Sequence, residues 1–181
     1  YDDAERVAID LARLRGARFL SPYDDPDVAA GNGGTLARDV LSQRAVRGVV
    51  IAPVGGGGLA SGLASAFGES CALWGAQSAA CPAMARSIER GSTIEVMHAT
   101  GPTLAEGLEG GVSLGGYERA RRALAGVIVV EERAIAEAMT WAREELGILI
   151  EGSSAVALAP VLAAHPLAKD AVVVLTGRNV D

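Results

Sequence analysis

The chain has 181 residues, the length of one ordinary domain, and half of them are hydrophobic. Its formal net charge is −6 at pH 7, which excludes nucleic acid and anionic membrane surfaces as partners. Its two cysteines are too few for a disulfide framework, and the apolar run 155–164 is too short to span a membrane. We therefore expect one α/β domain over residues 1–181, located in the cytoplasm.

The first quarter of the chain reads as helices separated by glycine and proline. Apolar residues repeat at helical spacing before Gly16, and proline and aspartate mark a loop soon after. The predicted elements are a helix over 3–15, a strand over 18–20, a loop over 22–26, a glycine turn over 31–34, and a helix with Leu36, Val40 and Leu41 facing inward.

Residues 48–67 carry the strongest local signal in the sequence. A β-branched, apolar run over 48–53 predicts a buried strand, four glycines follow at 55–58, and apolar residues at helical spacing begin at Leu59. Glycine lets the backbone approach an anion closely, and the free N–H groups of a helix start favour negative charge. This order of strand, glycine turn and helix predicts a site for a phosphate-bearing ligand.

Further strands and helices alternate along the remaining chain. They are a strand over 72–76, a helix over 82–90, an irregular stretch over 91–117, a helix over 117–124, a strand over 127–130, a helix over 132–146 with Ile135, Met139, Ala142 and Leu146 on one stripe, a helix capped by Ser153 or Ser154 that runs to Leu162, and a strand over 171–175.

This alternation predicts the fold class. Continuous apolar strands between helices are typical of a mostly parallel twisted sheet with helices on both faces. Ligands bind beyond the carboxyl ends of such strands. Two strand ends finish in small and polar residues, at 55–58 and at 176–179, and we expect the ligand there.

One alternative ligand is a dinucleotide. Gly55, Gly57 and Ala60 satisfy the G-x-G-x-x-A pattern, but the acidic residue expected about 20 positions later, which would bind a ribose hydroxyl, is replaced by Gln77. A small NAD-binding domain therefore stays open as an alternative reading.

Five motifs resemble the threonine/serine dehydratases and serine racemases, which are pyridoxal-phosphate (PLP) enzymes. They occur in that family's order: PYDDP at 22–26, PVGGGGL at 53–59, TLAEGL at 103–108, EG at 151–152 and LTGRNVD at 175–181. The resemblance covers nearly the whole chain and implies the large domain of a PLP fold-type-II enzyme.

The resemblance also implies roles for particular residues. Gly55, Gly56, Gly57, Gly58 and Leu59 would bind the PLP phosphate through backbone N–H groups. Thr176 would place its hydroxyl at the pyridine nitrogen, and Glu151 and Asn179 would support the same pocket. The implied reaction is β-elimination from a hydroxy amino acid, which gives a 2-oxo acid and ammonia. The family also implies a homodimer.

The sequence departs from the family at the lysine. The family's Schiff-base lysine lies far before the glycine turn, in a segment absent here, and the one lysine in the sequence is Lys169. We therefore expect residues 1–181 to resemble the C-terminal half to two-thirds of such an enzyme, to contain no catalytic residue, and to be inactive alone. The alternative from another class is a non-catalytic binding or assembly fragment.

A second departure concerns metal ions. Some relatives bind a divalent cation near the strand end where Gln77 lies, usually with a glutamate there. Gln77 brings no charge, and Ala83 stands where a further acidic ligand would be needed. Because hard cations prefer carboxylates, we expect no tight metal site.

Overall fold

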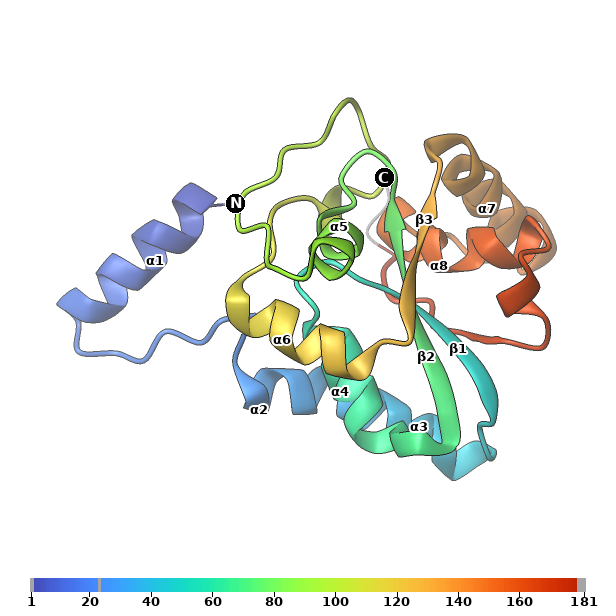
Figure 1. Cartoon of the computed structure of the whole chain (residues 1–181), viewed down its shortest axis with the longest axis horizontal. Helices are drawn as coiled ribbons and strands as arrows, with labels where there is room; N and C mark the ends of the chain where they lie inside the picture. Colours follow the sequence, from blue (N-terminus) through green and yellow to red (C-terminus); the bar gives the residue numbers. More distant parts are fainter. Residues whose placement is uncertain (1, 23, 179–181) are drawn as a thin grey trace.

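Four parallel strands form the central sheet in the computed structural model, which describes residues 2–22 and 24–178. The strands are β1 (Gly48–Pro53), β2 (Cys71–Ser78), β3 (Gly126–Val130) and β4 (Val172–Val173), and their order across the sheet is β3-β2-β1-β4. Val50 pairs with Leu73 on one side and Val172 on the other. The predicted α/β class with a parallel sheet is confirmed (Figure 1).

Helices cover both faces of the sheet. The α-helices in the described residues are α1 (Asp2–Leu14), α2 (Pro26–Ala29), α3 (Thr35–Gln43), α4 (Gly58–Phe67), α5 (Ala83–Arg90), α6 (Leu114–Ala123), α7 (Glu132–Glu145) and α8 (Gly152–Leu162). Short helical turns are η1 (Ala30–Gly34), η2 (Gly68–Ser70), η3 (Glu106–Leu108) and η4 (Pro166–Ala168). In Figure 1, α7 and α8 lie on one side of the strands and α3 to α6 on the other.

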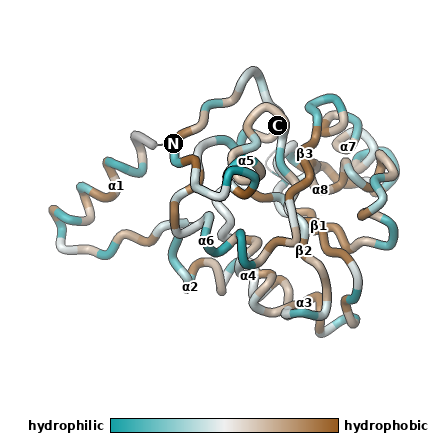
Figure 2. Tube along the Cα trace, in the orientation of Figure 1, coloured by the Kyte–Doolittle hydropathy of each residue, from teal (hydrophilic) through white to brown (hydrophobic). Residues whose placement is uncertain are grey.

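Alternating side chains of β1 divide the interior into two cores. Val50 packs with Leu63 of α4 in one core, while Ile51 packs with Val156 of α8 in the other. All four of these side chains are fully buried. Figure 2 shows β1 and β3 as mostly hydrophobic segments, while the outer helices alternate between hydrophilic and hydrophobic residues. A parallel sheet with helices on both faces buries its central strand on both sides, which explains the unbroken apolar run of β1.

Several predicted elements differ from the structure. Residues 18–20 form no strand, because no neighbouring strand offers them a ladder within the described part of the chain. The predicted glycine turn at 31–34 is part of a π-helical turn, η1, that continues α2 into α3. The strand predicted over 171–175 pairs only at Val172–Val173, although the N–H of Val174 still donates to the carbonyl of Ile51.

Two helices bury fewer of their apolar residues than predicted. Leu41 of α3 is exposed, and Ala37 is the fully buried residue of that helix. Leu146 lies just beyond α7 and is exposed, whereas Ile135, Ala138 and Ala142 are buried. In both cases the stripe facing the core is narrower than the sequence pattern suggested.

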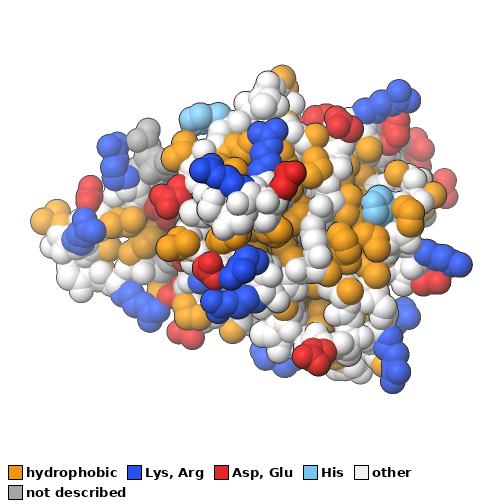
Figure 3. Space-filling model, in the orientation of Figure 1, with side chains coloured by type: hydrophobic (Ala, Val, Ile, Leu, Met, Phe, Trp, Pro, Cys, Tyr) orange, Lys and Arg blue, Asp and Glu red, His pale blue; other side chains and the backbone are white. Residues whose placement is uncertain are grey.

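Helix α1 extends away from the sheet (Figure 1), and its apolar side chains Val7, Leu11 and Leu14 are exposed. Elsewhere, acidic and basic side chains are interspersed over the face seen in Figure 3. Every helix in the described ranges is too short or too polar to cross a lipid bilayer.

Candidate functional site

The glycine turn after β1 has a backbone that only glycine supports at its centre. Gly57 has φ +91° and is the N-cap of α4, and no side chain among the described residues caps that helix. A Cβ on Gly57 would lie 3.0 Å from the carbonyl oxygen of Gly116 and 3.1 Å from the Cβ of Ala120. The first N–H groups of α4 are consequently left for a ligand or water.

A cavity of about 300 Å³ opens at this turn. Its walls come from Pro22, Asn32, residues 53–60, Gly107, Leu108, Glu151, Ser153 and Thr176. The structure therefore brings Gly55 to Leu59, Glu151 and Thr176 together around one cavity, from segments about 100 residues apart in the chain. Asn179, the remaining predicted site residue, lies outside the described residues.

Two successive serines at the start of α8 bind two lining residues of this cavity, Gly107 and Thr176. The Oγ of Ser153 accepts from the N–H of Gly107 at 2.9 Å, and the Oγ of Ser154 accepts from the N–H of Thr176 at 2.9 Å. The prediction that one of them caps α8 is wrong, because α8 begins at Gly152 with Glu151 as N-cap. Both hydroxyls instead bond to backbone groups of other segments.

Glu132 of α7 fixes the loop that contributes Gly107 and Leu108. Its carboxylate accepts from Ser78, from the hydroxyl of Thr103 at 2.8 Å and from the N–H of Leu104 at 2.8 Å. Partial burial raises the pKa of this carboxyl, but the three hydrogen bonds outweigh burial and leave the pKa below its usual value. Glu132 therefore acts as an ionised anchor for residues 103–104.

Helix α6 supports the glycine turn from outside. A Cβ on Gly116 would lie 2.2 Å from the carbonyl oxygen of Gly56, so the two backbones are in direct contact. Ser113 caps α6 by accepting from the N–H of Gly116 at 3.0 Å, and it donates to Asp24 at 2.8 Å. Asp24 also pairs with Arg119 at 2.6 Å. The loop at 22–26 is thereby tied to the helix that abuts the turn.

A second cavity of about 740 Å³ adjoins the first and shares Gly55, Gly56 and Gly107 with it. Glu95, Glu106 and Glu109 are among its lining residues. A molecule bound at the glycine turn would therefore have space on the side facing the loop 95–114.

Gln77 is fully buried and does not line either cavity. Its Oε1 accepts from the N–H groups of Met84 at 3.0 Å and Ala85 at 3.2 Å, at the start of α5, and its Nε2 has no partner within the described residues. In the dinucleotide reading the Gln77 side chain would bind the ribose, but its oxygen already accepts hydrogen bonds from the start of α5. Among the described residues, no three His, Cys, Asp or Glu side chains are grouped as metal ligands would be.

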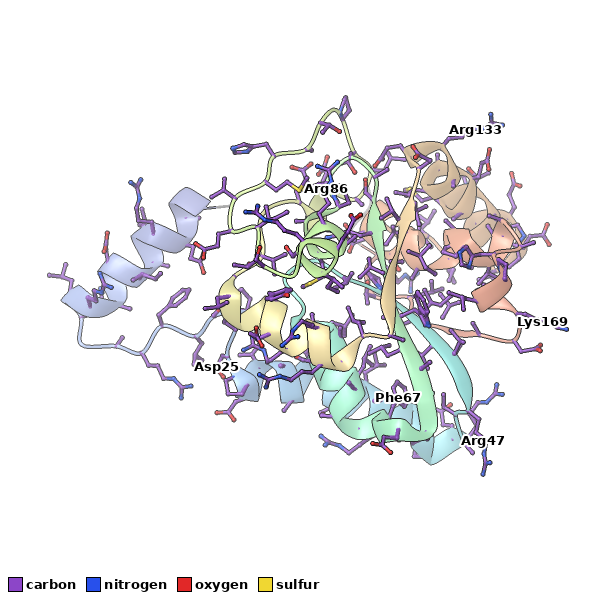
Figure 4. The ribbon with its side chains drawn as sticks, viewed as in Figure 1. Asp25, Arg47, Phe67, Arg86, Arg133 and Lys169 are labelled. Atoms are coloured by element: carbon purple, nitrogen blue, oxygen red, sulfur yellow. The ribbon has the colours of Figure 1, made fainter. Side chains whose placement is uncertain are left out.

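Lys169 lies between η4 and β4, is exposed, and points away from the body of the molecule (Figure 4). It lines neither cavity.

Sequence reasoning did not single out several residues that line the cavity. Pro22, Gly107 and Leu108 lie within the motifs at 22–26 and 103–108, and Asn32 lies within the predicted glycine turn at 31–34, but the sequence assigns none of them a role in the site. These residues are far in sequence from residues 55–58, and only folding brings Pro22, Asn32 and the segment at 103–108 beside α4 and α8.

Comparison with known proteins gives one consistent family. Residues 1–177 match the family described as "Pyridoxal-phosphate dependent enzyme". An L-threonine ammonia-lyase from Geobacter sulfurreducens is 34% identical over 189 aligned positions, which cover 100% of this chain and 46% of that protein. The chain spans about half the length of the curated relatives it matches.

Solved structures agree with the sequence comparison. A threonine deaminase from the organism abbreviated "T.th." superposes with a TM-score of 0.88 at 31% identity, covering 98% of this chain and 62% of that one. A maize serine racemase superposes with a TM-score of 0.87 at 27% identity, covering 98% and 56%. The chain is thus similar to both kinds of enzyme over nearly all its length.

Proposed function

The chain belongs to the family of pyridoxal-phosphate dependent enzymes, and from this premise we propose that its cavity binds the phosphate and ring of PLP for an ammonia-lyase reaction on a hydroxy amino acid. The observation that carries the proposal is that the glycine turn, Glu151 and Thr176 line one cavity. Threonine or serine is the proposed substrate, since the similar proteins include an L-threonine ammonia-lyase and a serine racemase.

The glycine turn fits a phosphate dianion. Residues 55–57 carry no side chains, so an anion can reach their N–H groups, and the 10-residue helix α4 adds the positive end of its dipole. The cavity of about 300 Å³ at this turn leaves space for such an anion. We propose that the N–H groups of Gly55 to Leu59 hold the phosphate in this space.

Thr176 and Glu151 fit the ring end of the same ligand. The Thr176 hydroxyl would face the pyridine nitrogen, and because a hydroxyl is a poor acid, the nitrogen would stay largely unprotonated. Glu151 donates its own N–H to the carbonyl of Gly177 at 3.1 Å, which keeps it beside Thr176. Asn179 is proposed to support the same end. When bound, PLP supplies an electron sink that lets the substrate lose its Cα proton.

Lys169 is not proposed to hold the cofactor. Its exposed position outside both cavities gives it none of the desolvation that a reactive lysine amine needs. We accordingly propose that residues 1–181 bind the cofactor's phosphate end but do not turn over threonine or serine by themselves.

Titration calorimetry tests the binding proposal with three non-reactive probes: inorganic phosphate, pyridoxine 5′-phosphate and pyridoxine. The alcohol replaces the aldehyde of PLP, so no lysine can react with it. The two phosphates should bind and compete with each other, while pyridoxine alone should bind weakly. Binding of NAD in the absence of any response to the phosphates would contradict the proposal and favour the dinucleotide reading.

A labelling experiment tests the role of lysine. PLP followed by borohydride should label Lys169 at well below one equivalent, and the treated chain should release no ammonia from serine. One equivalent of label on Lys169, together with turnover of serine, would contradict the proposal that this lysine is uninvolved.

We also propose a homodimer, as in the sequence-based expectation. The exposed apolar residues Val7, Leu11 and Leu14 of α1 would gain from being covered by a second copy. Sedimentation equilibrium of the wild type and of a variant carrying Leu11→Asp tests this, and a monomeric wild type would rule it out.

A further inference from the structure

The π-helical turn η1 lies directly against the helix that follows the glycine turn. Gly33 and Gly34 of η1 are buried, and a Cβ on Gly33 would lie 2.3 Å from the carbonyl oxygen of Leu59. A Cβ on Gly62 would likewise lie 2.8 Å from the Cα of Gly33 and 2.9 Å from the backbone nitrogen of Gly34. The backbones of η1 and α4 are therefore in contact with no side chains between them, and η1 cannot shift relative to α4 without losing this packing.

Asn32 immediately precedes Gly33, so this contact fixes its position beside the first turn of α4. Its carbonyl accepts from the N–H of Thr35, and the hydroxyl of Thr35 donates to the carbonyl of the preceding residue, Gly31, which fixes this backbone further. Asn32 is exposed and lines the cavity, and its side chain makes no hydrogen bond within the described residues. Asn32 thus combines a fixed backbone beside the cavity with a carboxamide that has no partner among the described residues, and π-helical turns often occur at functional sites.

We propose that Asn32 is a phosphate-binding residue, whose side-chain NH₂ donates a hydrogen bond to the phosphate of the ligand held by residues 55–59. The inference rests on the proposed function and adds a side-chain contact to a cradle otherwise made of backbone N–H groups. A neutral carboxamide is suited to this place because it donates to an anion, whereas a carboxylate would repel it. Asn32 would therefore favour phosphate esters over unphosphorylated rings.

Calorimetric titration of three proteins, namely the wild type, Asn32→Ala and Asn32→Asp, tests the inference with inorganic phosphate, pyridoxine 5′-phosphate and pyridoxine. Loss of a hydrogen bond to a charged group should weaken both phosphates about tenfold in Asn32→Ala. The added negative charge should weaken them on the order of a hundredfold in Asn32→Asp. Affinity for pyridoxine should stay unchanged in both variants.

Gln43→Glu is the matched control. Gln43 ends α3, is exposed and lies outside the cavity, so the substitution makes the same change from amide to carboxylate and the same change in net charge. It should leave phosphate affinity within about twofold, because a distant exposed charge is screened. Since Asn32 is exposed, the melting temperature of its variants should stay within about 2 °C of the wild type.

The outcomes separate the inference from the proposed function. If the wild type binds both phosphates but the Asn32 variants bind them equally well, the inference is overturned and the proposed function stands. A loss of pyridoxine affinity equal to the loss of phosphate affinity would also overturn it, since Asn32 would then serve the ring. If the wild type binds neither phosphate, the proposed function fails and the inference fails with it.

Discussion

The Oγ atom of Ser154 accepts a hydrogen bond from the backbone N–H of Thr176 at 2.9 Å. Ser154 is fully buried in the first turn of α8, while Thr176 follows the short strand β4 and lines the cavity. Because β4 pairs with β1 at only two positions, the chain after β4 is held by further hydrogen bonds. They are this one, the bond from the N–H of Val174 to the carbonyl of Ile51, and the bond from the N–H of Glu151 to the carbonyl of Gly177. The position of Thr176 therefore depends on α8 as well as on the sheet.

Replacing Ser154 by alanine should reduce stability. The N–H of Thr176 would lose its acceptor, which should lower the free energy of unfolding by about 1–2 kcal/mol. Urea denaturation measures this value. Ser42→Ala is the control, because Ser42 is exposed and donates only to the carbonyl of Asp39 within α3, and it should change stability by less than about 0.5 kcal/mol. Equal effects of the two substitutions would contradict the structural role given to Ser154.

Replacing Thr176 by valine should separate ring binding from phosphate binding. Valine keeps the shape of threonine but removes the hydroxyl proposed to face the pyridine nitrogen. Affinity for pyridoxine 5′-phosphate should fall about fivefold to tenfold, the effect of one hydrogen bond, while affinity for inorganic phosphate stays unchanged. Calorimetry with both probes makes the comparison, and an equal loss for both would place Thr176 at the phosphate instead.

Replacing Gly116 by alanine should disturb the glycine turn through α6. The new methyl group would lie 2.2 Å from the carbonyl oxygen of Gly56, so α6 and the turn must separate. We expect a loss of about 1–3 kcal/mol in the free energy of unfolding and weaker binding of inorganic phosphate. Gly101→Ala is the matched control, since nothing lies within 4 Å of a Cβ there. Unchanged phosphate affinity in Gly116→Ala would show that α6 does not support the turn.

Replacing Glu132 by glutamine should reduce stability in a pH-dependent way. The pKa of Glu132 is lower in the folded protein than its ordinary value of 4.5, so its ionised form stabilises the fold above that value, and this contribution disappears as the pH falls through the lowered pKa. The wild type should exceed Glu132→Gln in unfolding free energy by about 1–2 kcal/mol at pH 7, and the difference should shrink towards pH 3.

Urea denaturation of the wild type and of Glu132→Gln between pH 3 and about pH 7 measures both unfolding free energies. Subtracting one from the other at each pH cancels the contributions of groups that titrate in both proteins. Glu144→Gln serves as the control because Glu144 is exposed near the end of α7. The unfolding free energy of this variant should differ little from that of the wild type at every pH. A Glu132→Gln difference that stays constant with pH would mean that the charge of Glu132 does not hold the loop at 103–104.

Local patterns predicted most of the regular structure. The apolar runs at 48–53 and 127–130 are the strands β1 and β3, and the helix over 132–146 matches α7 within one residue. The pattern was wrong at 18–20 and at Leu41, where whether a residue is paired or covered depends on neighbours from elsewhere in the chain. The capping role predicted for Ser153 or Ser154 is wrong for the same reason. Their hydrogen-bond partners, Gly107 and Thr176, lie 46 and 22 residues away in the chain.

The sequence by itself determined the alternation of strands and helices, the glycine turn before α4 and the family, because these depend on residue types at short spacing. Only the tertiary structure decided which side chains surround that turn. Asn32, Gly107, Glu151 and Thr176 meet there because the parallel order of β1 and β4 and the backbone contact of η1 with α4 bring separate segments to one edge of the sheet. No local pattern encodes such a meeting, since it arises from packing between segments.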